Sequence, residues 1–375
     1  MKNTARGKQA SNGLHRIRVL HVGPGYGQRG GVASVLSELA AQQEAFATAA
    51  VDLAFFGTHG FRKMRDATRF AWQDIARFLR AVWWADIVHF HVSVRGSFYR
   101  KLLLYRIAKL CRRRTVFHLH SGNFDRFADR AGPLTRRAIR WFISNADAAV
   151  GVSQASAHVL DRFRGGSSVA RVIENMAIEA QNASAPAPAV PVLVRPYIAF
   201  AGRLTEQKGL PMLIDALAEL SLLGCEIDLV LAGEGDTRRW RDYARSRGVA
   251  DRVQFAGWLT GSFKSRFYRE ATLFCLPSRF ESFGIAALEA MFYGVPVVAT
   301  RVGGLGELVD DGVTGYLVEL DDAAALARVI HDIAHDPALR ERMGQAARER
   351  AHRLYTTERV VARYVDCYRQ IVERN

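Results

Sequence analysis

The sequence predicts an α/β protein built from two doubly wound domains that face each other across a cleft. Three observations support this prediction. Short apolar runs alternate with longer stretches of helical spacing, which is typical of parallel strands covered by helices on both faces. A segment rich in Ala and Pro, 180–191, interrupts the alternation, which then starts again. The length of 375 residues fits two domains at roughly 100–200 residues per domain.

The first domain is predicted over residues 1–185 and opens with a strand, a glycine-rich loop and a helix. The strand is the run 17–22, the loop contains Gly30 and Gly31, and 32–41 has helical spacing. This order is the opening unit of a doubly wound sheet. Later apolar runs predict further strands, at 51–56, 86–91, 115–120 and 148–152.

The second domain is predicted over residues 186–355 and repeats the pattern. Its strands are expected at 197–201, 228–232, 253–255, 273–276 and 296–299, and its main helices at 209–222, 237–247 and 284–292. A last helix, over 357–372 in the segment 356–375, has no strand after it. Ligands of open α/β sheets bind at the carboxyl ends of strands, so the cleft between the domains is the expected binding site.

The chain is strongly basic, with 52 Lys and Arg against 37 Asp and Glu and a formal net charge of +15. Such a surface attracts polyanions, whether nucleic acid, acidic lipid or a diphosphate-bearing substrate, although a high Arg content can also reflect a habit of the source genome. The four cysteines are widely spaced and form no CxxC, so neither a zinc site nor a disulfide framework is predicted. Residues 1–12 lack the apolar core of a secretory signal, and no run reaches the roughly 18–20 apolar residues of a membrane span. We therefore expect a cytoplasmic protein.

The segment 277–296 carries the most chemical information. Ser282 is the expected N-cap of a helix over 283–292. Glu281 then lies just before the helix and Glu289 in its second turn, on the order of 10 Å apart along the axis. One interpretation is that these acids only stabilise the start of a helix through its dipole.

The first turn of this predicted helix offers an anion site between the two carboxylates. Free N–H groups near Gly284 and Ile285 would bind a phosphate, while carboxylates accept hydrogen bonds from sugar hydroxyls. The resulting order of sugar, phosphate and sugar is that of a nucleotide-sugar.

A second loop, 202–209, follows a strand and precedes a helix. It places Arg203 and Lys208 at the edge of the sheet that faces the same cleft. Charge-assisted contacts to a diphosphate contribute roughly 1.5–3 kcal/mol each, so these cations could neutralise a departing diphosphate without a metal. Cations in a loop are otherwise usually solvated.

Together with Ala232-Gly-Glu-Gly-Asp236 and Gly303-Gly304-x-x-Glu307, these motifs resemble the retaining glycosyltransferases of family 4. The resemblance covers nearly all of the chain and is strongest in its second half, which holds the Glu-x7-Glu motif. It implies the GT-B fold of two Rossmann-like domains. It also implies transfer of a hexosyl unit from a UDP- or GDP-sugar to a hydroxyl of a glycan or a polyprenyl-diphosphate-linked acceptor, with retention, without a metal or cofactor, in bacterial surface-polysaccharide synthesis.

The resemblance also implies roles for single residues. Glu289 would bind the ribose, Glu281 the donor sugar, and His120 would approach that sugar. The implied catalytic residues are Glu281, His120, Arg203 and Lys208, and the implied donor-binding residues are Gly30, Gly31, Arg203, Lys208, Trp258, Leu259, Glu281, Ser282, Phe283, Gly284, Ile285 and Glu289. Asn175 stands in a segment that departs from the family pattern, so its role stays open. The last helix would cross back to the first domain.

A metal site is not predicted, because Asp310 and Asp311 have the character of a turn and Asp321 and Asp322 that of a helix start. Retention through a covalent intermediate needs a carboxylate near the anomeric carbon, and the sequence identifies none. A same-face route, in which the leaving phosphate helps to deprotonate the acceptor, requires less of the protein. His89 and His91, within a predicted strand, are more typical of structural histidines than of catalytic ones.

The acceptor is suggested by the stretch 95–114, which is basic and apolar and contains no acid, and by Arg62, Lys63, Arg65 and Arg69 before it. A basic amphipathic helix can lie on an anionic bilayer, so we expect a peripheral location on the inner face of the cytoplasmic membrane. The alternative is a core-packed helix with a solvated basic edge.

Three other functions compete with this interpretation. A GT-B-fold epimerase would need no acceptor site, and a phosphorylase would need a pyridoxal-phosphate lysine that cannot be assigned. A basic nucleic-acid-binding protein belongs to a different class. No helix-turn-helix, RRM or zinc pattern supports it, so no nucleic-acid partner is predicted.

Overall fold

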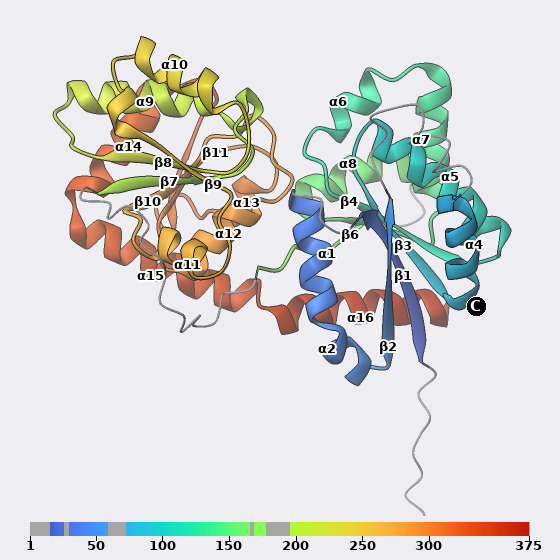
Figure 1. Cartoon of the computed structure of the whole chain (residues 1–375). Helices are drawn as coiled ribbons and strands as arrows, with labels where there is room; N and C mark the ends of the chain where they lie inside the picture. Colours follow the sequence, from blue (N-terminus) through green and yellow to red (C-terminus); the bar gives the residue numbers. More distant parts are fainter. Residues whose placement is uncertain (1–15, 26–29, 59–72, 166–168, 178–195, 375) are drawn as a thin grey trace, which may run out of the picture.

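The computed structural model describes residues 16–25, 30–58, 73–165, 169–177 and 196–374. Two parallel six-stranded sheets, each covered by helices, form two lobes (Figure 1). The strand order is β2-β1-β3-β4-β5-β6 in the first sheet and β12-β11-β10-β7-β8-β9 in the second. Counted from β7, the second order is that of a doubly wound sheet, which confirms the predicted fold class. The predicted linker 180–191 and the basic residues between 62 and 69 lie outside the described residues.

The first sheet contains every strand predicted for it, with ends displaced by one or two residues. Its strands are β1 (Ile17–Pro24), β2 (Val51–Thr58), β3 (Ile87–Val92), β4 (Arg114–Leu119), β5 (Ala148–Gly151) and the unpredicted β6 (Arg171–Val172). Its helices are α1 (Gly31–Ala41), α2 (Gln43–Thr48), α4 (Ile75–Trp84), α5 (Gly96–Leu110), α6 (Phe124–Asp129), α7 (Pro133–Asn145) and α8 (Gln154–Arg164).

The second sheet has one strand more than predicted. Its strands are β7 (Tyr197–Ala201), β8 (Asp228–Ala232), β9 (Val253–Gly257), β10 (Leu273–Leu276), β11 (Val297–Thr300) and β12 (Gly315–Val318). Its helices are α9 (Leu210–Leu222), α10 (Thr237–Ser246), α11 (Gly261–Arg269), α12 (Ile285–Phe292), α13 (Leu305–Leu308), α14 (Ala323–His335) and α15 (Pro337–Leu354), with short 3-10 turns at Glu206–Lys208 and Ala250–Arg252. The prediction that the sheet ends with the strand at 296–299 was wrong, because the short edge strand β12 follows a turn-rich segment that hides its apolar pattern.

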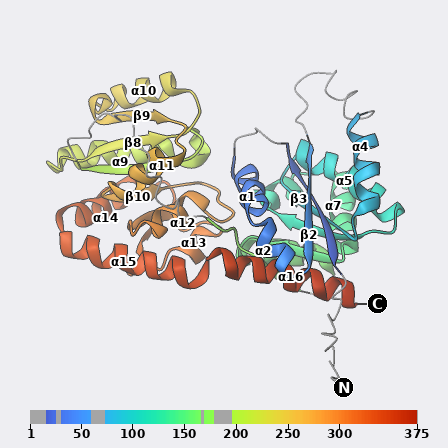
Figure 2. The same cartoon turned by 60° about the horizontal axis from the view of Figure 1, so that its bottom comes forward.

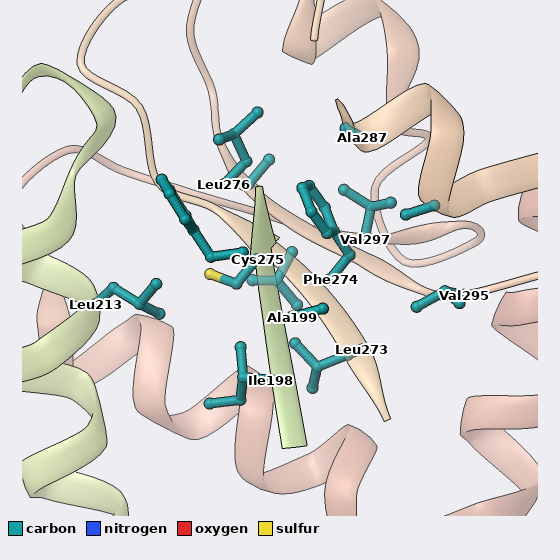
Figure 3. Packing of buried hydrophobic residues seen from close by; sticks show 14 of the residues in the cluster. Ile198, Ala199, Leu213, Leu273, Phe274, Cys275, Leu276, Ala287, Val295 and Val297 are labelled. Carbon is teal, nitrogen blue, oxygen red and sulfur yellow. The ribbon is translucent and has the colours of Figure 1, made fainter. Parts of the chain in front are cut away.

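The centre of the second sheet is packed with apolar side chains. Ile198 and Ala199 of β7 and Phe274 and Cys275 of β10 are fully buried between helices on both faces (Figure 3). Continuous burial of this kind is what a central parallel strand requires. All four cysteines of the chain are free thiols, and three of them are buried.

Helix α16 (Thr357–Glu373) follows α15 and lies against the first domain, beneath β1 and α2 (Figure 2). Its apolar side, which includes Val361 and Val365, packs in the same cluster as Val19 of β1. Arg114 at the start of β4 donates a hydrogen bond of 2.6 Å to the carbonyl of Ile371. Helix α16 therefore holds the second domain against the first through packing and a hydrogen bond.

Candidate functional site

A cleft of about 360 Å³ lies between the two domains. It is lined at the carboxyl ends of β7 and β10, the two strands between which the order of the second sheet reverses. Ligands of doubly wound sheets bind at such a reversal. Every residue of the predicted donor-binding set lines this cleft, and so does His120.

Helix α12 begins later than expected, and the prediction that Ser282 caps it was wrong. The helix starts at Ile285, and Gly284 stands in the capping position with a φ of 102°. That left-handed backbone favours glycine, and a Cβ on Gly284 would lie 2.6 Å from a side-chain carbon of Leu305. The first bond within the helix, from the Leu288 N–H to the Gly284 carbonyl, leaves the N–H groups before it free for an anion.

Ser282 acts across the cleft instead. Its hydroxyl donates a hydrogen bond of 3.1 Å to the carbonyl of His120 in the first domain. Close to it, the guanidinium of Arg126 lies 4.1 Å from the ring centre of Phe280. Both contacts join the segment before α12 to the first domain.

Glu281 is fixed by a cation and by its own backbone. Lys208 Nζ lies 2.5 Å from Glu281 Oε2, and Oε1 accepts a hydrogen bond of 3.1 Å from the Ser282 N–H. The backbone is held from behind by Gly303, whose φ is 48°. A Cβ on Gly303 would lie 1.9 Å from the Glu281 carbonyl oxygen, so only glycine allows this contact.

Glu289 is almost fully buried and is held by two partners on α11 that the sequence did not suggest. Lys264 forms an ion pair with Oε1, and the Tyr268 hydroxyl donates a hydrogen bond of 2.7 Å to Oε2. Burial, and then the charge of Glu289, raise the pKa of Tyr268 well above its usual value. Lys264 and Tyr268 stand four residues apart on one helix, so they share a face; that spacing was the available signal.

The two predicted phosphate-binding cations differ in their surroundings. Lys208 is paired with Glu281, whereas Arg203 is exposed in the cleft and has no ion pair or hydrogen bond with any described residue. Arg203 is thus the cation that an incoming anion meets without displacing a partner.

His120 is nearly buried at the end of β4, where Nε2 lies 2.8 Å from Nδ1 of His91. Burial, followed by the positive charge of Lys101, lowers the pKa of His120 to about 3. The imidazole is therefore neutral. Asn175 also lines the cleft, and its buried Oδ1 has no hydrogen-bond partner among the described residues.

Glu307, the acid of the second glycine motif, reaches from the second domain to the first. Its carboxylate accepts hydrogen bonds of 2.7 Å each from the N–H groups of Gln154 and Ala155, at the start of α8. An acid at a helix N-terminus satisfies free donors and interacts well with the dipole. The motif therefore closes a contact between the domains.

Comparison with known proteins shows what the sequence and the fold of this chain resemble. Residues 190–350 match the family Glycosyl transferases group 1. The chain is 33% identical over 178 residues to the alpha-D-kanosaminyltransferase of Streptomyces kanamyceticus. The aligned region covers 47% of this chain and 46% of that protein. The chain thus spans about half the length of the curated relatives it matches.

Solved structures resemble the chain over almost its whole length. The sucrose-phosphate synthase from Thermosynechococcus elongatus superposes with a TM-score of 0.74 at 22% identity, over 96% of this chain and 100% of that one. Anabaena HepE in complex with UDP and glucose also gives 0.74, at 20% identity, over 95% and 100%. The fold is therefore GT-B. Among the described residues, no helix is long and apolar enough to span a membrane.

Proposed function

We propose that the protein is a metal-independent, retaining glycosyltransferase that moves a hexosyl unit from a UDP- or GDP-sugar to a hydroxyl of a glycan or lipid-linked glycan. The observation that carries this proposal is the order of groups along one wall of the cleft. Glu289, the free N–H groups at the start of α12, and Glu281 follow one another there, as ribose, diphosphate and hexose follow one another in the donor.

The surroundings of the two acids support different roles. Each oxygen of Glu289 already accepts one bond and has a lone pair left for a ribose hydroxyl, so the site is organised before the nucleotide arrives. Glu281 is neutralised by Lys208, which disfavours it as a nucleophile. We therefore favour the same-face route, in which Arg203 and Lys208 stabilise the departing diphosphate.

Substitution of the two acids tests this division of roles. Glu289→Ala should weaken nucleotide binding at least tenfold with a smaller loss of turnover, because hydrogen bonds to charged groups contribute about 1.5–3 kcal/mol. Glu281→Ala should lower turnover as well. The measurements are calorimetric titration with UDP and GDP, and donor hydrolysis with UDP-glucose, UDP-N-acetylglucosamine and GDP-mannose, each with and without EDTA. Equal, purely binding defects in both variants would contradict the division.

The same experiments separate the competing functions. A protein stabilised thermally by oligonucleotides but by neither UDP nor GDP would be a nucleic-acid-binding protein. Release of a free epimerised sugar, independent of any acceptor, would identify an epimerase. Loss of activity in EDTA that Mg²⁺ restores would show that metal independence is wrong.

We also propose that the first domain lies on an anionic membrane, where a lipid-linked acceptor of surface-polysaccharide synthesis would be found. Helices α4, α5 and α7 lie side by side on one face of the first sheet (Figure 1). Together they contain nine Lys and Arg residues and no Asp or Glu. They also expose large apolar side chains, namely Leu79, Trp83, Trp84, Tyr99, Leu103, Leu110, Leu134 and Trp141.

This surface differs from the single amphipathic helix expected at 95–114. Lys101 of α5 points inward, is 2% exposed, and donates a hydrogen bond of 2.7 Å to Ser97. Burial, and then the charge of Arg100, lower the pKa of Lys101 to about 7. The basic and aromatic face is therefore shared among three helices, with Trp83 65% and Leu110 84% exposed. Aromatic and aliphatic side chains among cations are typical of proteins that bind at a bilayer interface.

Flotation with liposomes tests the membrane proposal. The protein should float with vesicles containing phosphatidylglycerol at low salt and less so at high salt, because surface charges are screened. A Trp83→Ala/Leu110→Ala variant should bind at least fivefold more weakly, since each lost side chain removes apolar area from the interface. The control is Leu222→Ala/Leu223→Ala, which removes an exposed apolar pair from the second domain. Equal weakening by both variants, or no flotation of the wild type, would contradict the proposal.

A further inference from the structure

Six buried side chains form one continuous hydrogen-bonded chain that ends in the cleft. Its order is His118, His89, Tyr368, His21, His91 and His120. The successive contacts measure 3.0 Å, 2.9 Å, 3.3 Å, 2.9 Å and 2.8 Å. Five members come from β1, β3 and β4 or the residue after β4, and the sixth comes from α16. We call this set the histidine chain.

Every imidazole in the histidine chain is neutral. All five histidines are buried, and burial lowers the pKa of each well below its usual value, to about 3 for His21 and His120. A neutral imidazole has one N–H donor and one acceptor nitrogen, and a tyrosine hydroxyl can donate one bond while accepting another. If the Tyr368 hydroxyl accepted both of its bonds, its own buried O–H would be left unpaired, so it donates one bond and accepts the other. The direction of one hydrogen bond then dictates the direction of all the others, and the whole chain has two such arrangements.

The far end of the histidine chain selects between them. Nε2 of His118 is buried and forms no hydrogen bond of ordinary length among the described residues. However, the backbone of Ile173 raises the pKa of His118, as a hydrogen-bond acceptor beside an imidazole does. The Ile173 N–H is already used by the Gly151 carbonyl, so the facing group is the Ile173 carbonyl. An N–H on Nε2 of His118 suits a carbonyl, whereas a lone pair there would face another lone pair.

We propose that this chain, through Tyr368, fixes His120 as the tautomer with its proton on Nε2, so that Nδ1 presents an acceptor lone pair to a hydroxyl of the bound substrate. Nε2–H of His120 then donates to Nδ1 of His91. In each of the following contacts, the member nearer to His120 donates to the next member, as far as His118. Nδ1 of His120 has no partner among the described residues. The substrate part of this inference rests on the proposed function, while the tautomer itself does not.

Tyr368 is accordingly a positioning residue, and His120 is the group that meets the substrate. The chain does not carry a proton away, because its far end meets a carbonyl that cannot accept and pass one on. An ion is the rival occupant, since His89, His91 and His118 could together hold a metal. A metal there would take lone pairs that the hydrogen bonds already use, and would break the chain.

Tautomers can be measured directly by ¹⁵N NMR of histidine-labelled protein, without substrate. In the wild type, Nδ1 of His120 should resonate as an unprotonated nitrogen and Nε2 as a protonated one. Tyr368→Phe keeps the ring and removes the linking hydroxyl, so His21, His91 and His120 can reverse together and the His120 signals should move towards the average of the two tautomers. Tyr364→Phe is the matched control. Tyr364 lies one turn away, packs on the same histidines and has a buried hydroxyl without a described hydrogen bond.

Turnover provides the second measurement. Tyr368→Phe should lower kcat for donor hydrolysis or transfer about tenfold, because one hydrogen bond to the substrate is lost, and should leave the affinity for UDP or GDP within twofold. Tyr364→Phe should match the wild type in both. A His120 tautomer unchanged in Tyr368→Phe, a proton on Nδ1 in the wild type, or stoichiometric zinc in the purified protein would each overturn the inference. If no donor is turned over, the proposed function fails, and the ¹⁵N signals still decide the tautomer.

Discussion

The two domains share a sheet architecture but fill it differently. Strands β7 and β10 of the second domain contribute only apolar or small side chains at their centre, such as Ile198, Ala199 and Phe274. The corresponding region of the first domain contains buried histidines, with His21 opposite His89 and His91 opposite His118 in the strand register. A buried polar row is tolerated because every ring nitrogen of the five histidines has a hydrogen-bond partner, except Nε2 of His118 and the cleft-facing Nδ1 of His120. The comparison shows that one topology can stabilise either an inert core or a hydrogen-bonded core that leads to a ligand.

The largest expected difference between the two cores is their response to acid. The five histidines have folded pKa values below 6.5, their usual value, so below pH 6.5 the unfolded chain binds protons that the folded chain does not. Stability is therefore present above pH 6.5 and is lost as the pH falls. Each histidine contributes up to about 1.4 kcal/mol per pH unit, so the first domain should lose about 3–7 kcal/mol between pH 7.5 and 5.5.

Hydrogen exchange on the whole chain can locate this loss. Amides of β3 and β4 should lose most of their protection at pH 5.5, after correction for the intrinsic rate, while those of β8 and β10 keep more of theirs. Equal loss in both sheets would show that the histidines do not control acid stability.

A second prediction concerns the close backbone contact between Gly303 and Glu281 in the second domain. Gly303→Ala should lower the free energy of unfolding by roughly 1–3 kcal/mol and reduce turnover at least tenfold, because a left-handed backbone and the Glu281 carbonyl both exclude a Cβ. Gly306→Ala, three residues on, is the control, since a Cβ there meets nothing within 4 Å. Equal urea-unfolding free energies and equal turnover in the two variants would contradict the claim that position 303 excludes a Cβ.

The fold was largely predictable because the central strands are short apolar runs that alternate with stretches of helical spacing. The lining of the cleft was predictable where a residue type has a strong local reason, as at Glu281, Arg203 and Gly284, and the roles of these residues stay predictions. The site was not predictable where the role of a residue depends on another residue that only the fold brings beside it. Ser282 has the usual preference of an N-cap, but Gly284 can adopt the left-handed turn and takes that place. Lys264 looks like any solvated lysine until α11 is placed beside Glu289.

The histidine chain was missed for a different reason. The sequence predicts a structural role for His89 and His91 and a place beside the donor sugar for His120, but it does not connect these residues with one another. His89 with His91, and His118 with His120, stand two residues apart, which places both members of each pair on one face of a strand. The spacing was therefore visible in the sequence. What the sequence alone does not reveal is that Tyr368, from the other end of the chain, connects His89 with His21.

The smallest expected effect lies where the domains meet. Glu38 of α1 has a pKa raised to about 8, first by burial and then by the charge of Glu289, with Lys264 acting in the opposite sense. A raised carboxyl pKa contributes stability that is complete below the unfolded value of 4.5 and is lost as the pH rises through 8. This sign is opposite to that of the histidines.

The free energy of unfolding of Glu38→Gln should therefore rise by roughly 1–2 kcal/mol relative to that of the wild type as the pH rises from 5.5 to 8.5, because the amide carries no charge to bury. The measurement is the difference between the two urea-unfolding free energies at each pH, in which the histidine contribution cancels. Glu44→Gln on α2 controls for removal of an exposed acid from the same domain. A constant difference across this range would mean that Glu38 ionises freely and that neither its burial nor the charge of Glu289 keeps it neutral. A growing difference would show that α1 of the first domain meets the second domain at a carboxyl group held neutral by its burial.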